Sequence, residues 1–175
     1  MADGRGLLNL DPIRVAWVRI PPPPLMDKNL VLISGAIVYR YQNDKVEWFL
    51  VRHQDTNEWE IPKVTVRKGE SSVRAALRIM GEKGAMTTRV LEEAGRAGGT
   101  TTLNGKTVPQ RYIYYLMVLK LSSKEPIGFQ SYEWFEYPKA IKKLSSKRET
   151  SMLRDAKDTY KKWKKERKAR RKKQA

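Results

Sequence analysis

Hydrophobic and polar positions along the first two thirds of the chain follow patterns that are typical of β-strands. Runs rich in β-branched and aromatic residues cover 30–41 and 46–53, and the turn residues 42–45 lie between them. This pattern predicts a β-hairpin. Residues 98–120 predict a second hairpin around Asn104-Gly105, followed by a long buried strand.

The segments between these hairpins are shorter and more polar. Residues 54–63 predict an exposed loop that returns to the body of the protein, with Trp59 as its anchor. Residues 87–95 predict a strand and a turn, and Glu92–Gly95 is expected to form a loop after that strand.

One central helix is predicted where the hydrophobic period changes. From Ser71 onward, residues three and four apart form one apolar stripe, which consists of Val73, Ala76, Leu77 and Met80. Glycines at 81 and 84 mark the end of the helix. Ile79 lies well away from the centre of this stripe on an ideal helix, so core packing is not expected to require it.

Helical spacing returns near the end of the chain. Residues 131–145 predict a strand passing into a helix that buries Ala140, Ile141 and Leu144. Apolar residues then continue at helical intervals, at Met152, Ala156, Tyr160 and Trp163. We therefore expect a final helix that is packed on the domain up to about Trp163 and free beyond it.

The order of these elements indicates an α+β fold, a sandwich around a mixed sheet. Three parts are expected along the chain. Residues 1–28 form an N-terminal extension with a short strand at 13–20 and a polyproline spacer at 21–24. Residues 29–160 form one domain, and 161–175 form a basic helical tail.

The charge of the chain is concentrated in that tail. The 175 residues carry a formal net charge of +17, and the last fifteen, with ten Lys or Arg and one Glu, supply +9 of it. Such a block is typical of a solvated arm that contacts RNA or another polyanion, and a merely solubilising end is the alternative. The residues expected to contact nucleic acid are Lys161, Lys162, Lys164, Lys165, Arg167, Lys168, Arg170, Arg171, Lys172 and Lys173.

Composition excludes several kinds of chemistry. The chain has no cysteine, which excludes disulfides, thiolate zinc sites and cysteine nucleophiles, and any metal would need oxygen ligands or the single histidine, His53. The sequence has no signal-peptide pattern and no apolar run near the roughly 18 residues of a membrane span. No membrane partner is expected, and the expected location is the cytoplasm, with the mitochondrial matrix as the alternative.

The polar side of the central helix carries the candidate chemistry. Ser71, Arg78 and Glu82 share the face opposite the apolar stripe on an ideal helix. An arginine and a glutamate one turn apart can simply form an ion pair, so these residues alone do not indicate a site.

The stretch 59–86, WEIPKVTVRKGESSVRAALRIMGEKGAM, resembles the Nudix box. The family pattern is Gly, five residues, Glu, seven residues, Arg-Glu, an aliphatic residue, any residue, Glu-Glu, any residue, Gly and an aliphatic residue. The match needs no gap, and it agrees at Glu70, Arg78, Met80, Glu82 and Met86. The departures are Val64 for Gly, Ile79 for Glu, Lys83 for Glu and Ala85 for Gly.

The resemblance extends over about residues 30 to 155. It includes Gly35-Ala36-Ile37, the strand YIYYLMV at 112–118 and the segment YEWFEYPKAIKKL at 132–144. It implies the Nudix-type α/β/α sandwich around a mixed sheet, and it is most similar to the diadenosine-polyphosphate-hydrolase branch of the family.

In the Nudix family, glutamates at the Arg-Glu and Glu-Glu positions hold divalent ions, usually Mg²⁺, against a diphosphate. Only Glu82 of these three is kept, so the resemblance implies a weak magnesium site in which Glu82 and Glu70 are the metal-binding and catalytic residues. Glu58 or Glu60 could complete it. Lys83 would repel a cation, but its charge would partly replace the metal's toward a bound phosphate. The residues expected to bind phosphate or ligand are Lys63, Arg67, Lys68, Arg74, Arg78 and Lys83.

Other residues carry weaker signals. His53 is expected to be a surface or strand-end histidine rather than a base, because no Ser and Asp arrangement accompanies it. Tyr112 and Tyr114 lie on one face of a strand, and Tyr115 is next to them in the sequence. Core packing is expected for these tyrosines, with base stacking as the alternative.

Functions of different classes agree with the sequence. The first is a Nudix-fold protein with a degenerate metal site that binds a nucleotide, a diphosphate or RNA with little or no turnover. A ribosome-associated role is an available analogy for it. The second is an active Nudix hydrolase that cleaves a nucleoside diphosphate linked to another group, such as a dinucleoside polyphosphate, with Mg²⁺. The third is a scaffold whose basic tail only contacts partners.

Overall fold

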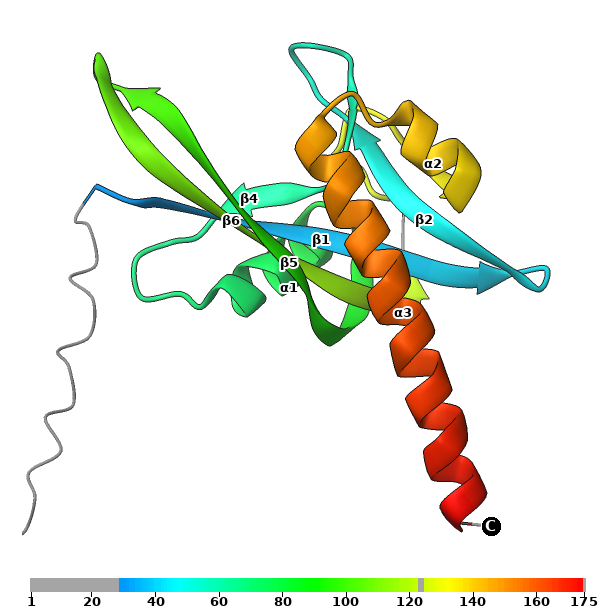
Figure 1. Cartoon of the computed structure of the whole chain (residues 1–175). Helices are drawn as coiled ribbons and strands as arrows, with labels where there is room; N and C mark the ends of the chain where they lie inside the picture. Colours follow the sequence, from blue (N-terminus) through cyan, green and yellow to red (C-terminus); the bar gives the residue numbers. More distant parts are fainter. Residues whose placement is uncertain (1–28, 123–124, 175) are drawn as a thin grey trace, which may run out of the picture.

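One mixed sheet of seven strands organises the protein, and helices lie on both of its faces (Figure 1). The computed structural model describes residues 29–122 and 125–174, so the strand expected at 13–20 and the polyproline spacer at 21–24 lie outside the described residues. In chain order the elements are β1 (Val31–Gln42), β2 (Lys45–Arg52), β3 (Trp59–Glu60), β4 (Lys63–Thr65), α1 (Ser72–Glu82), β5 (Met86–Leu103), β6 (Lys106–Ser122), β7 (Tyr132–Glu136), α2 (Tyr137–Lys143) and α3 (Lys147–Gln174). The expected α/β/α sandwich is confirmed.

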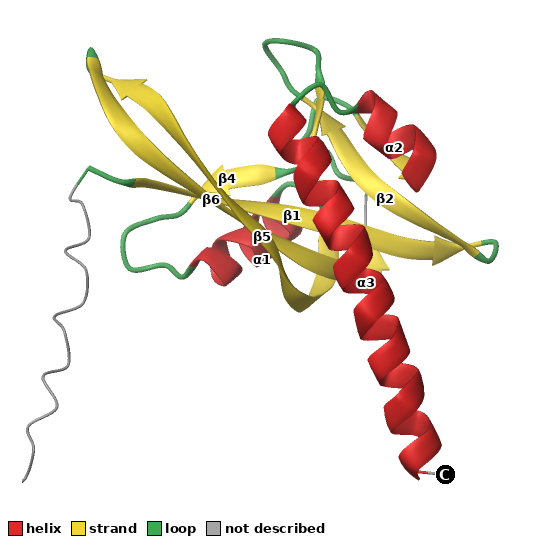
Figure 2. Cartoon of the chain, viewed as in Figure 1, coloured by secondary structure: helices red, strands yellow, loops and turns green. Residues whose placement is uncertain are grey.

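The strands are hydrogen-bonded in the order β3-β2-β1-β6-β5, while β4 pairs with β1 and β7 pairs with β2. The β1–β6 pair is parallel and the other pairs are antiparallel, which makes the sheet mixed. Both predicted hairpins are present (Figure 2). They turn at Asn43–Asp44 and at Asn104-Gly105, where positive φ angles suit Asn, Asp and Gly.

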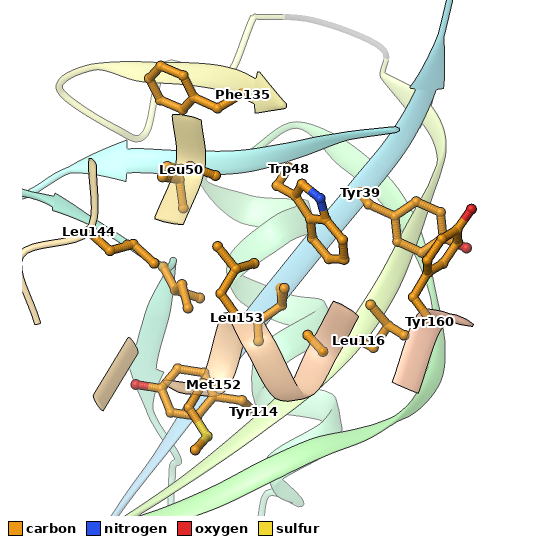
Figure 3. Packing of buried hydrophobic residues seen from close by; sticks show 14 of the residues in the cluster. Tyr39, Trp48, Leu50, Tyr114, Leu116, Phe135, Leu144, Met152, Leu153 and Tyr160 are labelled. Carbon is orange, nitrogen blue, oxygen red and sulfur yellow. The ribbon is translucent and has the colours of Figure 1, made fainter. Parts of the chain in front are cut away.

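Alternate residues of β1 face two separate cores, as the pleat of a strand requires. On one face, Ile37 and Tyr39 pack with residues of α2 and α3. Figure 3 shows this cluster, in which Leu153 and Tyr160 of α3 lie close to Trp48 of β2. Burial of these large side chains holds α3 across the sheet.

The opposite face of β1 packs against α1. Ala36 and Val38 belong to a second buried cluster with Ile79 and Met80 of α1 and Phe49 of β2. The loop before α1 and the last turn of α1 are thereby fixed at one end of the sheet.

The apolar stripe predicted for the central helix is wrong at two positions. Ile79 is 2% exposed and lies in the core, whereas Leu77 is 38% exposed. The buried face of α1 consists of Ala75, Ala76, Ile79 and Met80. The two small alanines allow α1 to approach the sheet closely, and this rotates the helix away from the orientation that a simple average of its apolar residues predicts.

Ala85 follows α1 and has a backbone φ of 48°, in the left-handed region that favours glycine. The Nudix pattern has glycine at this position. We expect Ala85→Gly to stabilise the fold by about 1 kcal/mol, because it removes the steric cost of the alanine Cβ at this φ. Urea denaturation of the two proteins would measure this, with Gly98→Ala in an open part of β5 as a glycine–alanine control without a positive φ. An unchanged or lower free energy of unfolding would contradict the prediction.

Glu92–Gly95 lie inside a strand, so the predicted loop at these residues is wrong. β5 pairs with β6 along its length, with register shifts between Val90 and Glu92 and between Glu93 and Gly95. A bulge adds a residue to one strand without ending the pairing. The segment Glu92–Gly95 therefore resembles a turn in sequence, although it belongs to one continuous strand.

α3 is one continuous helix that begins on the sheet and runs past it (Figure 1). Its last buried residue is Tyr160, Trp163 is partly exposed, and Lys164–Gln174 are exposed. The prediction that the helix is packed up to about Trp163 is confirmed, but the helix is not free directly beyond it, because Arg167 and Arg170 line a hollow together with Arg89 of β5. No helix in the described part of the chain is both long enough and apolar enough to span a membrane.

Candidate functional site

A pocket of about 340 Å³ opens between β2, β4, the last turn of α1 and the loop around Gly128. We term it the β2–α1 pocket. Residues of β2 and β4 line one part of it. Ile79 and Lys83, which occupy the two Nudix-box positions where glutamate is replaced, also line it. The lining includes Arg52, His53, Glu60, Lys63, Ile79 and Lys83.

The last turn of α1 supplies one side of this pocket. Ile79 and Lys83 both line it, so the two replaced glutamate positions come together in space. The backbone N–H of Gly128 donates a hydrogen bond to the Lys83 carbonyl at 3.1 Å. A Cβ on Gly128 would lie 2.5 Å from the Lys83 Cα, so this loop packs directly onto the end of the helix.

Glu70 holds the loop before α1. Its carboxylate accepts two hydrogen bonds from the Arg78 guanidinium, at 2.7 and 2.9 Å, and one from the Arg67 backbone N–H at 3.0 Å. The Arg78 side chain also donates to the Thr65 carbonyl. The hydrogen bonds from Arg78 lower the pKa of Glu70 to about 2. This carboxylate is therefore engaged in tying the loop to the helix, and it does not line the β2–α1 pocket.

Glu82 lies near the end of α1, outside the lining of the pocket. Its side chain is 59% exposed and lies 3.9 Å from the Arg78 guanidinium, as an i,i+4 ion pair. It is not among the residues that line the pocket. The two carboxylates expected to hold Mg²⁺, Glu70 and Glu82, therefore share Arg78 as a partner.

The residues present do not fit a Nudix magnesium site. Among residues 29–122 and 125–174, no group of three or more His, Asp or Glu side chains could hold a metal ion. Glu60 lines the pocket, but its carboxylate pairs with Lys63, and Glu58 does not line the pocket. An apolar Ile79 and a cationic Lys83 stand where hard oxygen ligands would be needed.

A buried ionic cluster forms the floor beside the pocket. The Lys63 ammonium lies between the carboxylates of Glu60 and Glu149, with Glu149 at 2.8 Å, and Glu149 also accepts from the Ile61 N–H at 2.9 Å. Burial raises the pKa of Glu149, although Lys63 opposes this effect. Burial alone would lower the pKa of Lys63, but the two carboxylates raise it above its ordinary value. Lys63 is therefore a charged side chain whose partners are already supplied by the protein.

Glu149 was not among the predicted site residues, although the sequence contains a signal for it. It precedes Met152 by three residues and is 3% exposed, so it occupies the apolar stripe of α3. A charged residue at such a position needs a buried partner. Its partner, Lys63, is far away in the sequence and is identified only by the fold.

Of the six predicted phosphate-binding residues, the structure brings Lys63 and Lys83 together at the β2–α1 pocket. Arg67, Lys68 and Arg74 are exposed and do not line it, and Arg78 is engaged with Glu70. The expected cluster of six cations is therefore divided between the pocket and the outer surface of α1 and its preceding loop.

Arg52 is a pocket cation that sequence reasoning missed. Its Nε atom is buried and has no hydrogen-bond partner among the described residues, while Nη1 donates to Asn57 at 3.2 Å. The guanidinium lies 4.9 Å from the centre of the Trp59 ring. Nothing in the strand pattern distinguishes this arginine from an ordinary exposed one.

His53 also lines the pocket. Its Nδ1 accepts a hydrogen bond from the Asp55 backbone N–H at 3.2 Å. In the neutral ring this leaves the proton on Nε2. The expectation that His53 ends a strand agrees with its position directly after β2.

The three tyrosines of β6 are engaged in packing. The rings of Tyr112 and Tyr114 are stacked at 6.4 Å, and Tyr114 is fully buried. The Arg148 guanidinium covers Tyr112 at 3.8 Å, and the Tyr115 hydroxyl is hydrogen-bonded to Ser72. Core packing, the expected role, is confirmed for Tyr112 and Tyr114.

Comparisons with known proteins agree with this fold. No family model matches the sequence, and no curated protein matches it. Solved structures do match. A Caenorhabditis elegans Ap4A hydrolase in a binary complex has a TM-score of 0.62 and 25% identity over 74% of this chain and 97% of that one.

Two more distant structures have the same fold. The NUDIX domain of Shewanella oneidensis NrtR, solved with ADP ribose, has a TM-score of 0.62 and 16% identity over 79% of this chain and 93% of that one. The Escherichia coli dihydroneopterin triphosphate pyrophosphohydrolase has a TM-score of 0.55 and 12% identity over 70% of this chain and 91% of that one. Fold, box and neighbours together place this chain in the Nudix hydrolase superfamily, and the likeness to the Ap4A hydrolase agrees with the resemblance to the diadenosine-polyphosphate-hydrolase branch.

Proposed function

We propose that this protein binds a nucleotide or another diphosphate-containing ligand in the β2–α1 pocket, with little or no metal-dependent turnover. One observation carries the proposal: Ile79 and Lys83, which replace two of the family's metal-binding glutamates, both line this pocket. The replacements therefore change the site itself and not a remote surface of the fold.

Electrostatics supports binding without a metal. A diphosphate needs positive charge around it, which Mg²⁺ supplies in the family. Here Lys83 and Arg52 add two cations to the wall of the pocket. The Arg52 guanidinium is a charged donor group at the pocket to which an anionic ligand oxygen can bind. Lys63 contributes less, because Glu60 and Glu149 already balance its charge.

The same features oppose hydrolysis. Activation of water for attack on phosphorus requires a metal held by carboxylates in a defined geometry. Glu70 is engaged with Arg78, Glu82 does not line the pocket, and Ile79 offers no ligand atom. The chain thus has groups that hold a phosphate but lacks the usual groups that activate water.

The identity of the neighbours narrows the ligand class. One is an Ap4A hydrolase, and another was solved with ADP ribose. Both compounds contain a nucleoside joined to a second group through phosphates. We propose this class of ligand for the pocket. Likeness along 97% of the Ap4A hydrolase also supports an active hydrolase as the second candidate.

Calorimetric titration with ADP-ribose and with diadenosine tetraphosphate, in EDTA and in Mg²⁺, separates the two candidates. Binding is expected in EDTA and is expected to change little with Mg²⁺. Lys83→Ala should weaken it about tenfold, because one charge-assisted contact is lost. Lys68→Ala is the matched control, since Lys68 is an exposed lysine outside the pocket.

Turnover is measured in parallel on the same ligands. Binding that requires Mg²⁺, together with product formation that is abolished in Glu82→Gln, would contradict the binding-only proposal and establish the hydrolase. Absence of binding and of turnover with every ligand of this class would contradict both candidates.

A further inference from the structure

α3 continues beyond its last buried residue, Tyr160, and the side of the helix that faces the sheet can be followed past that residue. Met152, Ala156 and Tyr160 are buried residues separated by one turn each. The same stripe continues at intervals of three and four with Trp163, Arg167 and Arg170. Beyond Tyr160, therefore, a tryptophan and arginines replace the apolar residues on the side of the helix that faces the sheet.

The arginines on this part of the helix gather on one side, where Lys164 also lies near the rings of Tyr41 and Tyr160. All three arginines after Tyr160 lie on or beside the domain-facing stripe, and Arg171 stands five turns after the buried Leu153. The opposite side carries a stripe of lysines at intervals of four, three and four, formed by Lys161, Lys165, Lys168 and Lys172. A tail that served only solubility would not need its arginines gathered on one side of the helix.

A hollow of about 200 Å³ lies between this stripe and β5. Arg89 of β5 forms one wall, and the α3 residues that line it are Trp163, Glu166, Arg167 and Arg170. We term it the arginine hollow. The Arg167 guanidinium lies 5.2 Å from the centre of the Trp163 ring, and the ring remains partly exposed. Three cations and one carboxylate give the lining a net positive charge.

This lining matches the chemistry of a polynucleotide better than that of an acidic protein. Arginine presents a planar fork that binds phosphate oxygens in pairs. Tryptophan presents an aromatic face on which a base can stack. A carboxylate-rich peptide would use the arginines but would have no group for the indole. Phosphates and bases occur together in nucleotides and in nucleic acids, and the row of cations along α3 favours the polymer, whose phosphates are repeated.

The position of the hollow favours a single strand over a duplex. One of its walls is the sheet, through Arg89, so the arginine side of α3 cannot be surrounded by a groove of a double helix. Bases in a duplex are also stacked on one another and are not free to stack on Trp163. The lysine stripe faces away from the hollow and adds attraction that depends on salt but not on base stacking.

We propose that the arginine hollow binds a single-stranded nucleic acid, with Arg89, Arg167 and Arg170 on phosphates and Trp163 against a base. This goes beyond the function proposed for the β2–α1 pocket, because the two sites share no lining residue. Either site can therefore fail in its test without affecting the other.

The test uses the full chain and an unstructured, labelled RNA of roughly 12 nucleotides, with fluorescence anisotropy over a salt series. The double variant Arg167→Lys with Arg170→Lys keeps the positive charge but removes the planar guanidinium groups that bind phosphate oxygens in pairs. We expect affinity to fall about fivefold or more while the salt dependence stays the same. Lys165→Arg with Lys168→Arg is the matched control on the opposite stripe, and it should not weaken binding.

Trp163→Leu tests the stacking contact, and we expect it to lower affinity about fivefold or more. Circular dichroism and the thermal midpoint of each variant establish that the domain remains folded. A hairpin RNA whose base-paired stem contains as many nucleotides as the single strand should bind more weakly than the single strand.

Three results would overturn the proposal. One is equal affinity of the Arg→Lys variant and the native chain. Another is unchanged affinity in a folded Trp163→Leu variant. The last is competition by polyglutamate that is as effective as competition by unlabelled single-stranded RNA, which would show that the helix attracts polyanions in general.

Discussion

Replacing Ile79 with glutamate is expected to destabilise the domain by about 3 kcal/mol at neutral pH, although glutamate is the residue of the Nudix pattern at this position. Ile79 is 2% exposed and packs with Met80, Phe49 and Val38. The substitution removes apolar contacts and places a carboxylate among apolar side chains at a position with almost no exposed surface. Chemical denaturation of the two proteins would measure the difference in the free energy of unfolding.

Leu77→Glu is the matched control for this change. It places the same charge on the same helix, but Leu77 is 38% exposed, so the cost should stay below about 1 kcal/mol. Burial raises the pKa of the new carboxyl at position 79. The extra loss should therefore be small at a pH below the carboxyl's unfolded pKa and should grow as the pH rises through its folded pKa. Equal losses for the two variants would contradict the buried placement of Ile79.

The burial of Ile79 limits any attempt to restore a metal site in this pocket. Lys83 is exposed, so Lys83→Glu should cost little stability and should remove the cation from the pocket wall. Because Ile79 supports the core, the double change Ile79→Glu with Lys83→Glu would need a stabilised background such as Ala85→Gly. Manganese relaxation would then report whether carboxylates at both positions bind a divalent ion.

Glu149→Ala is expected to cost about 3 kcal/mol, because it leaves the buried Ile61 N–H without its acceptor and removes one of the two carboxylates of Lys63. The side chain of Glu149 is 3% exposed, so water cannot replace it without entering the core. Denaturation midpoints and the slopes of the transitions would give the free energy.

Glu93→Ala removes a carboxylate of similar geometry from an exposed pair with Arg96, and it should cost less than about 1 kcal/mol. A third variant separates the charge from the packing. Glu149→Leu with Lys63→Met replaces both partners by apolar side chains and should recover part of the loss. If Glu149→Ala costs no more than Glu93→Ala, the ionic cluster does not hold α3 to β4.

Much of the fold could be predicted from local patterns. The two hairpins depend on alternating strands and on turn residues that accept positive φ, and both features are local. The helix at 72–82 begins after a capping serine, and α3 follows from residues at intervals of three and four. The Nudix resemblance predicted how these elements are arranged in one fold. It could do so because agreement at many spaced positions is hard to meet by chance.

The prediction was wrong where packing with distant segments decides the outcome. An average over apolar residues placed Leu77 in the core and Ile79 outside it, but the alanine pair determines which side of α1 meets the sheet. In β5, Gly95 resembles a turn residue, but pairing with β6 continues through bulges because β6 supplies a long partner strand.

By itself, the sequence determined the class of fold, the loss of two glutamates from the Nudix box and the position of the basic tail, because these depend on the order and spacing of residues along one chain. Only the tertiary structure decided how the charges are used. It pairs Glu70 with Arg78, neutralises Lys63 with Glu149 and brings Arg89 to the arginines of α3. The energy of a charge depends on its distance from other charges and on its burial, and both are set when remote segments pack together.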